Sequence, residues 1–268
     1  MLITPKMNIQ YPMALERDYA KQLQTYVRKL TAICIKHIPK MVDAIMLNSI
    51  RTDDWTEETT DDIERDINEE LSILAVILAM FNRVHTFSTK QQDKVFKSVF
   101  GSIPKGIPKS EIDKIKRIWV DQNLSLIKSI DQRTLESIRY SLSRNIIKAV
   151  DKEILVDELT DSIKHMAHVN ENRAALIACD QVGKLNGQLA QLQQMDLGNK
   201  YYKWVTMHDN RVRPAHQERE GRIFAWDDPP SGGHPGWAIR CRCSAADCYD
   251  TDKIGLKPIK GTFTEVRR

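Results

Sequence analysis

Apolar residues recur every three or four positions over most of the chain up to residue 197, which is the period of an amphipathic helix. One apolar stripe runs through residues 19–45 and a second through residues 63–81, and further stripes follow between residues 112 and 192. Residues 82–89 interrupt this pattern and indicate a break between helices. The pattern therefore predicts an essentially all-helical region with no substantial strand before Gly198.

Polar residues and glycines mark where these helices should begin and end. A segment rich in Gly and Pro, residues 101–109, is the clearest linker in the first half of the chain. Ser110 has the residue type that caps the start of a helix, and Asn170 predicts the start of the last long helix. We therefore expect three consecutive regions: an N-terminal helical region (1–109), a helical segment (110–169) and a small C-terminal domain (170–268).

After Gly198 the pattern changes to short runs that are typical of strands. The candidate strands are residues 201–207, 222–226, 243–249 and 262–266. A loop dense in Pro and Gly lies between the second and third of them. The expected fold class is α+β, with a long mostly helical region followed by a small α+β domain that has a short sheet. The helix that begins at Asn170 should pack against that sheet.

The composition is that of a globular protein, with 41% hydrophobic and 28% charged residues. The net charge of +4 permits contact with a nucleic acid or an acidic protein surface but requires neither. The first 19 residues carry prolines and charges without an apolar core, so they do not read as a signal peptide. The most apolar run, residues 71–81, is too short to cross a bilayer. We expect a protein that is made in a cytoplasm.

Histidines and cysteines gather near the C-terminus and suggest a metal site. The chain has five cysteines, and in a reducing compartment clustered thiols indicate a metal before a disulfide. The candidate ligands of a structural zinc ion are His216, His234, Cys241 and Cys243. Cys248 and His208 are alternative ligands. Because zinc knuckles usually have a Cys-x-x-Cys spacing, a second interpretation stays open: the histidines bond to the backbone, and the cysteines are small buried hydrophobes.

Charged residues follow the first candidate strand. Asp209, Arg211 and Arg213 lie there, and a carboxylate and a guanidinium can pair in bidentate fashion and hold a loop in place. His216 and the glutamates that follow it could in principle supply acid and base groups. No phosphate-binding loop, paired metal-binding carboxylates or nucleophile elbow accompanies them in the sequence. We therefore predict that the protein is not an enzyme.

The order of these residues resembles the phage Mu F-like head morphogenesis family over about residues 131–250. The matching marks, including the structural motif, are residues 173–178, Asp180, Trp204, Asp209, Arg211, Arg213, His216, Gly221, an Asp-Asp-Pro-Pro loop, His234, Pro235, Cys241 and Cys243. The resemblance implies a minor capsid protein that is carried inside the virion of a tailed bacteriophage. It also implies association with the portal protein and with other capsid or scaffold proteins, and a role in head assembly and in DNA packaging or delivery.

A second function stays open, that of a nucleic-acid-acting protein in the virion, either a DNA-end binder or a nuclease. The basic residues near the C-terminus that could contact phage DNA are Lys253, Lys257, Lys260, Arg267 and Arg268. One contiguous basic face that joined these residues to Arg211, Arg213 and Arg219 would favour DNA binding. Scattered charges would favour the assembly role.

Overall fold

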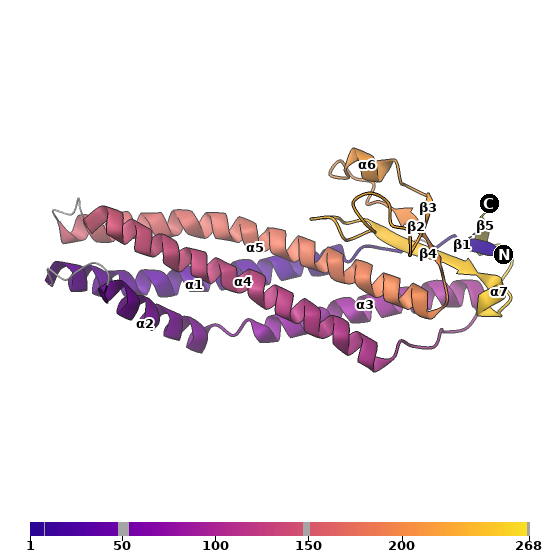
Figure 1. Cartoon of the computed structure of the whole chain (residues 1–268), viewed down its shortest axis with the longest axis horizontal. Helices are drawn as coiled ribbons and strands as arrows, with labels where there is room; N and C mark the ends of the chain where they lie inside the picture. Colours follow the sequence, from indigo (N-terminus) through magenta and orange to yellow (C-terminus); the bar gives the residue numbers. More distant parts are fainter. Residues whose placement is uncertain (8, 48–53, 147–150, 267–268) are drawn as a thin grey trace. The chain divides into compact units, whose positions relative to one another are not determined.

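The computed structural model describes residues 1–7, 9–47, 54–146 and 151–266. The long helices are α1 (Met13–Leu47), α2 (Asp54–Glu70), α3 (Leu74–Phe100), α4 (Lys109–Ile146) and α5 (Lys152–Asp196). The short helices are α6 (Pro214–Gln217) and α7 (Thr251–Ile254). The strands are β1 (Leu2–Pro5), β2 (Tyr201–Val205), β3 (Ile223–Ala225), β4 (Ser244–Asp250) and β5 (Phe263–Glu265). Figure 1 labels these elements, and their content confirms the α+β class.

The strands form one antiparallel sheet in the order β3-β2-β4-β1-β5. Strands β2 to β5 match the four candidate strands to within two residues at each end. The expectation of no substantial strand before Gly198 is wrong for β1, whose four residues are all buried. Ile3 of β1 pairs with Tyr249 on one side and with Glu265 on the other. Four residues are too few to show a period, and their hydrogen-bond partners lie at the other end of the chain.

Two of the predicted helix boundaries are wrong. Residues 82–89 lie inside α3, and Asn170 lies inside α5 rather than at its start. The buried side chain of Asn170 donates a hydrogen bond to the Thr134 hydroxyl over 2.9 Å, so a tertiary contact satisfies a residue that looks like a cap. The start predicted at Ser110 is confirmed to within one residue, since α4 begins at Lys109.

The chain divides into two compact units, each built from separate segments. The first unit contains residues 1–17, 79–120 and 179–268, and the second contains residues 18–78 and 121–178. Helices α1, α3, α4 and α5 contribute to both units because each of them crosses a boundary between these segments. The division into consecutive regions that end at residues 109 and 169 stays a prediction.

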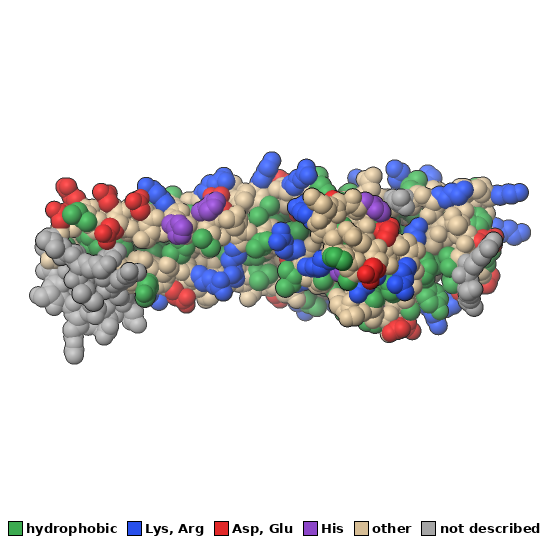
Figure 2. All heavy atoms as spheres, turned by 90° about the horizontal axis from the view of Figure 1, so that it is seen from above, with side chains coloured by type: hydrophobic (Ala, Val, Ile, Leu, Met, Phe, Trp, Pro, Cys, Tyr) green, Lys and Arg blue, Asp and Glu red, His purple; other side chains and the backbone are tan. Residues whose placement is uncertain are grey.

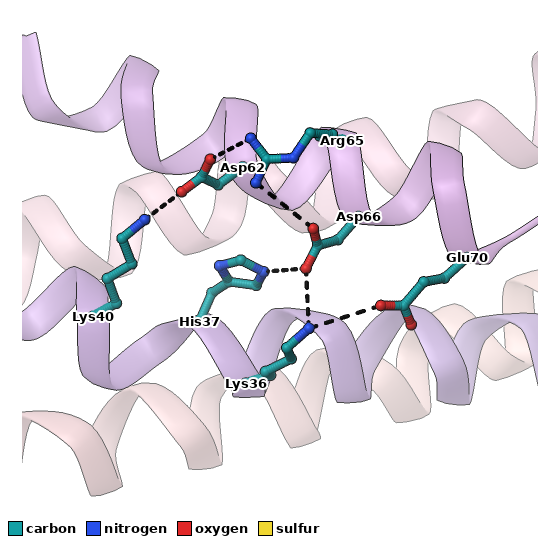
Figure 3. Close-up of polar contacts among 7 residues, drawn as sticks. All are labelled: Lys36, His37, Lys40, Asp62, Arg65, Asp66 and Glu70. Carbon is teal, nitrogen blue, oxygen red and sulfur yellow. Dashed lines mark hydrogen bonds and ion pairs between the residues drawn. The ribbon is translucent and has the colours of Figure 1, made fainter.

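In the second unit, charged side chains join α1 to α2 (Figure 3). The side chains drawn there are Lys36, His37 and Lys40 of α1 and Asp62, Arg65, Asp66 and Glu70 of α2. The centre of the group is Asp66, whose Oδ2 lies 2.8 Å from Nε2 of His37 and 3.2 Å from Nζ of Lys36. These hydrogen bonds, first that from His37, lower the pKa of Asp66. The ion pairs of the exposed lysines stabilise little, so burial of Ile63 and Ile67 does more to hold α2.

Among the described residues, no single helix is long and apolar enough to cross a membrane. Residues 61–70 and 74–100 reach that length and apolar character only when they are taken together, with a bend of 43° between them. Ile77, Met80 and Phe81 of α3 are buried within the protein.

In the first unit, the sheet packs against α3 and against the C-terminal part of α5. Phe96 and Phe100 of α3 contact the ring of Tyr249 on β4, at centroid distances of 5.7 and 5.2 Å. The amide of Gln194 on α5 donates a hydrogen bond to the Ala245 carbonyl over 2.8 Å. The prediction that this helix covers the sheet is therefore confirmed.

A carboxyl group lies in the core of the first unit. Asp247 of β4 is fully buried, and the amide of Gln92 on α3 donates a hydrogen bond to its Oδ1 over 2.6 Å. Burial raises the pKa of Asp247 to about 6, because the charged form is poorly solvated there. The folded state therefore binds this proton more tightly than the unfolded state does.

We expect the substitution Asp247→Asn to stabilise the protein at neutral pH. Because its pKa is raised, the protonated carboxyl contributes its full share of the folding free energy below its ordinary pKa of 3.8. That contribution is lost as the pH rises through about 6. An asparagine keeps the acceptor for Gln92 and cannot ionise, so the free energy of unfolding should rise by about 2 kcal/mol at pH 7.5. Urea unfolding at pH 4 and pH 7.5 checks this. The gain should vanish at pH 4, and Asp228→Asn, in an exposed loop, should show no comparable pH dependence.

Candidate metal centre

Three of the four predicted ligands meet in the first unit. Nδ1 of His216 lies 3.6 Å from Sγ of Cys241 and 3.5 Å from Sγ of Cys243. All three side chains are buried, and their ligand atoms lie within 4.8 Å of one another. In a tetrahedral zinc site, ordinary Zn–N and Zn–S bond lengths place N and S about 3.5 Å apart. The two N–S distances in the cluster therefore match those in a zinc site.

The segment that connects β2 to β3 positions His216. This residue lies in α6, which begins at Pro214, and its ring packs perpendicular to Trp204 of β2 at 5.2 Å. The guanidinium of Arg219 lies over the Trp204 ring at 5.1 Å. Gly221 has a φ of +72° and donates its N–H to the Trp204 carbonyl over 2.9 Å, which closes the turn into β3.

The two cysteines come from the segment directly before β4, and their pKa values shift in opposite directions. A hydrogen bond from Cys243, the largest contribution, lowers the pKa of Cys241 to about 5, and the same bond raises the pKa of Cys243. The N–H of Gly236 points at the Cys241 sulfur over 3.4 Å. These shifts favour a thiolate at Cys241, next to the imidazole of His216. A bound zinc ion would favour thiolates at both cysteines.

Asp209 pairs mainly with an arginine that the sequence reasoning overlooked. Nη2 of Arg242 lies 2.9 Å from Oδ1 of Asp209, and Nη1 lies 2.8 Å from Oδ2, so the pair is bidentate. Hydrogen bonds, first that from Arg242, lower the pKa of Asp209. Arg211 adds its backbone N–H at 3.1 Å. Arg213, which was expected to take part, instead donates to the Ile239 carbonyl over 2.6 Å. Arg242 lies between two cysteines, and neighbouring side chains of an extended segment point to opposite sides. That alternation could have suggested that Arg242 points away from the cysteines.

His234 is not a member of the three-residue cluster. Its ring is buried, and Nδ1 lies 2.9 Å from the Tyr202 hydroxyl. The rings of Trp226 and Trp237 each lie 4.9 Å from it. Burial lowers the pKa of His234, against a hydrogen bond to the Trp226 backbone that raises it. For this residue, the geometry favours the interpretation as a hydrogen-bonded structural histidine.

The two alternative ligands lie outside the cluster as well. Cys248 is buried within β4, where burial raises the pKa of its thiol to about 12. His208 follows β2 with a φ of +55°, and its Nε2 lies 3.6 Å from a carboxylate oxygen of Glu220.

Two glycines of α5 allow the loop that carries the cysteines to approach the helix. A Cβ atom at Gly183 would lie 2.6 Å from the Cys241 carbonyl oxygen, and one at Gly187 would lie 2.4 Å from the Pro235 carbonyl oxygen. Real Cβ atoms do not come so close to backbone, so both positions require glycine. Pro235 and Gly236 are buried at this contact. The sequence reasoning missed this pair, although two glycines four residues apart in a helix lie on one face.

The basic residues proposed to contact DNA do not all fall within the described residues. Lys253, Lys257 and Lys260 are exposed, whereas Arg267 and Arg268 lie outside the described residues. On the face seen in Figure 2, Lys and Arg side chains are spread among acidic, polar and hydrophobic ones. Whether the named residues form one contiguous basic face stays a prediction.

Residues 141–246 match the protein family described as phage Mu protein F-like, which confirms the resemblance over this region. An uncharacterized protein of Haemophilus influenzae is 35% identical over 136 residues, which are 50% of this chain. The matched segment is only 30% of that relative's length. No solved structure matches the chain. The matched family region contains the complete His216–Cys241–Cys243 cluster.

Proposed function

We propose, from the phage Mu F-like character of residues 141–246, that this protein is a structural protein of a bacteriophage head and acts in head morphogenesis. That family match is the single observation that carries the proposal. In its finer form, the protein is a minor capsid component that resides in the virion, associates with the portal protein and other capsid or scaffold proteins, and supports DNA packaging or delivery. We propose no catalytic activity.

The architecture of the first unit supports a structural role. His216, His234, Cys241 and Cys243 are buried in contacts that hold loops together, and Asp209 is held in a bidentate pair with Arg242. These are arrangements that stabilise a fold. The alternative, a nuclease or a DNA-end binder, requires a contiguous basic face or exposed acid and base groups, and the scattered charges in Figure 2 favour it less.

We further propose that His216, Cys241 and Cys243 hold a structural zinc ion, with a water molecule or an added side chain as the fourth ligand. The N–S distances of 3.5 and 3.6 Å support this proposal, and so does the buried pair of thiols with one thiolate. The ion would fix the loop of residues 227–243 to α6. Zinc would thereby offset the loss of conformational entropy in a segment that makes few backbone hydrogen bonds within itself.

The assembly role is tested on particles from cells that carry this gene. Procapsids and mature heads are purified, and their proteins are counted by quantitative mass spectrometry. We expect a few copies of this chain per particle and cross-links to the portal protein. Particles from a deletion strain should form heads with reduced DNA content or infectivity. Absence of the chain from both procapsids and heads, together with normal particle yield after deletion, would overturn the proposal.

A further inference from the structure

A cavity of about 380 Å³ lies next to the metal-binding cluster in the first unit. One wall consists of His216, Cys241 and Cys243. Its lining also contains four positively charged side chains, those of Arg211, Arg213, Arg240 and Arg242. Three other cavities formed by described residues have at most two Lys or Arg side chains each in their linings. The basic character of this cavity is therefore local, in contrast to the scattered surface charges.

The arginines are held in place by the backbone and by one carboxylate. Arg242 is fixed by its bidentate pair with Asp209, and Arg213 by its hydrogen bond to the Ile239 carbonyl. Arg240 adopts a left-handed backbone with a φ of +59°, which is rare for a residue with a side chain. Its N–H is held by Oδ1 of Asp180 over 3.2 Å. Strain of this kind is maintained where the surrounding structure requires one conformation, and it is common at binding sites.

The acidic groups nearby offset only part of this charge. Asp209 pairs with Arg242 and lies near Arg211, and Asp180 pairs with Lys184 at 2.7 Å. Glu16 acts on Arg242 and forms a hydrogen bond with Cys179 of the cavity lining. Within the part of the chain that the structure describes, no carboxylate lies within ion-pair distance of Arg213 or Arg240. Both of these side chains are exposed to solvent. The Arg240 guanidinium, and the N–H groups of Arg213 that do not bond to Ile239, can therefore bind an anion that enters from outside.

We propose that this cavity binds a phosphoryl group. Guanidinium groups bind oxyanions through paired N–H donors, and a phosphoryl group offers a double negative charge and three acceptor oxygens to several arginines at once. A single carboxylate would leave most of the arginine charge uncompensated. The phosphoryl group is supplied either by free phosphate or by the terminal phosphate of a nucleic acid strand. This inference is independent of the head-assembly role.

The test compares two double variants that each remove two positive charges from the first unit. Arg213→Gln with Arg240→Gln alters the cavity, while Lys253→Gln with Lys257→Gln alters exposed residues elsewhere. Isothermal titration calorimetry is run with inorganic phosphate in a phosphate-free buffer. We expect the arginine variant to bind phosphate at least about tenfold more weakly and the lysine variant to bind as the parent does. Thermal unfolding of both variants checks that they fold, and Arg213→Gln alone replaces the double variant if it does not.

The source of the phosphoryl group is separated with short single-stranded oligonucleotides that carry either a 5′-phosphate or a 5′-hydroxyl. Tighter binding of the phosphorylated strand, lost in the arginine variant, identifies a nucleic acid end. Binding of inorganic phosphate without that preference identifies free phosphate. The proposal is overturned if neither probe binds the parent protein, or if the arginine and lysine variants weaken binding equally, since that result would show general charge attraction.

Discussion

Replacement of Cys243 by serine is expected to remove bound zinc from the protein and to lower its free energy of unfolding by about 5 kcal/mol or more. Structural zinc contributes on the order of 10 kcal/mol to the folding of small zinc domains, and serine is a poor zinc ligand. The two N–S distances already match those in a zinc site, so the substitution breaks a formed cluster. Elemental analysis of protein purified without an affinity tag gives the metal content, and urea unfolding gives the stability.

Two matched variants separate zinc binding from loss of packing. Cys248→Ser also places a hydroxyl at a buried cysteine, but it lies outside the cluster, so it should keep the metal and cost about 1–3 kcal/mol. His234→Asn should keep the metal too, because its ring contacts Tyr202 instead of the cluster. Metal-free parent protein, with equal losses for Cys243→Ser and Cys248→Ser, would instead support a hydrogen-bonded cluster without zinc.

The second large effect is expected from Gly187→Ala. The added methyl group would lie 2.4 Å from the Pro235 carbonyl oxygen, and the backbone of Pro235 and Gly236 leaves it no space. The loop must then move away from α5, and the free energy of unfolding should fall by about 3 kcal/mol, at the upper end of the cost of overpacking. Because Pro235 leads into the segment that carries Cys241, the metal content should fall as well. Urea unfolding and elemental analysis measure both effects.

Gly106→Ala is the control for this substitution. Nothing lies within 4 Å of a Cβ atom at Gly106, and its backbone is not left-handed. The control should change the stability by less than about 1 kcal/mol and leave the metal content unchanged. If Gly187→Ala behaved like Gly106→Ala, the close contact between α5 and the loop would not exist in solution.

Local sequence determined much of the fold of this protein. The three-and-four spacing of apolar residues specifies helices, since each such stripe must be buried, and the short aromatic and β-branched runs after Gly198 specify β2 to β5. The residue types at His216, Cys241 and Cys243 also predicted that these three side chains meet, as they do in the structure. These features depend on the chemistry of neighbouring residues, which is why they can be recognised in a sequence.

Only the tertiary structure decided the remaining features, because each depends on a partner that is distant in the chain. β1 becomes a strand by pairing with β4 and β5, and Asn170 stays inside a helix because Thr134 satisfies its amide. His234 bonds to the Tyr202 hydroxyl and does not join the cysteines. Arg242, and not Arg213, pairs with Asp209. Spacing along a chain shows which side chains share a face. Hydrogen bonds and close contacts between segments determine which of them meet.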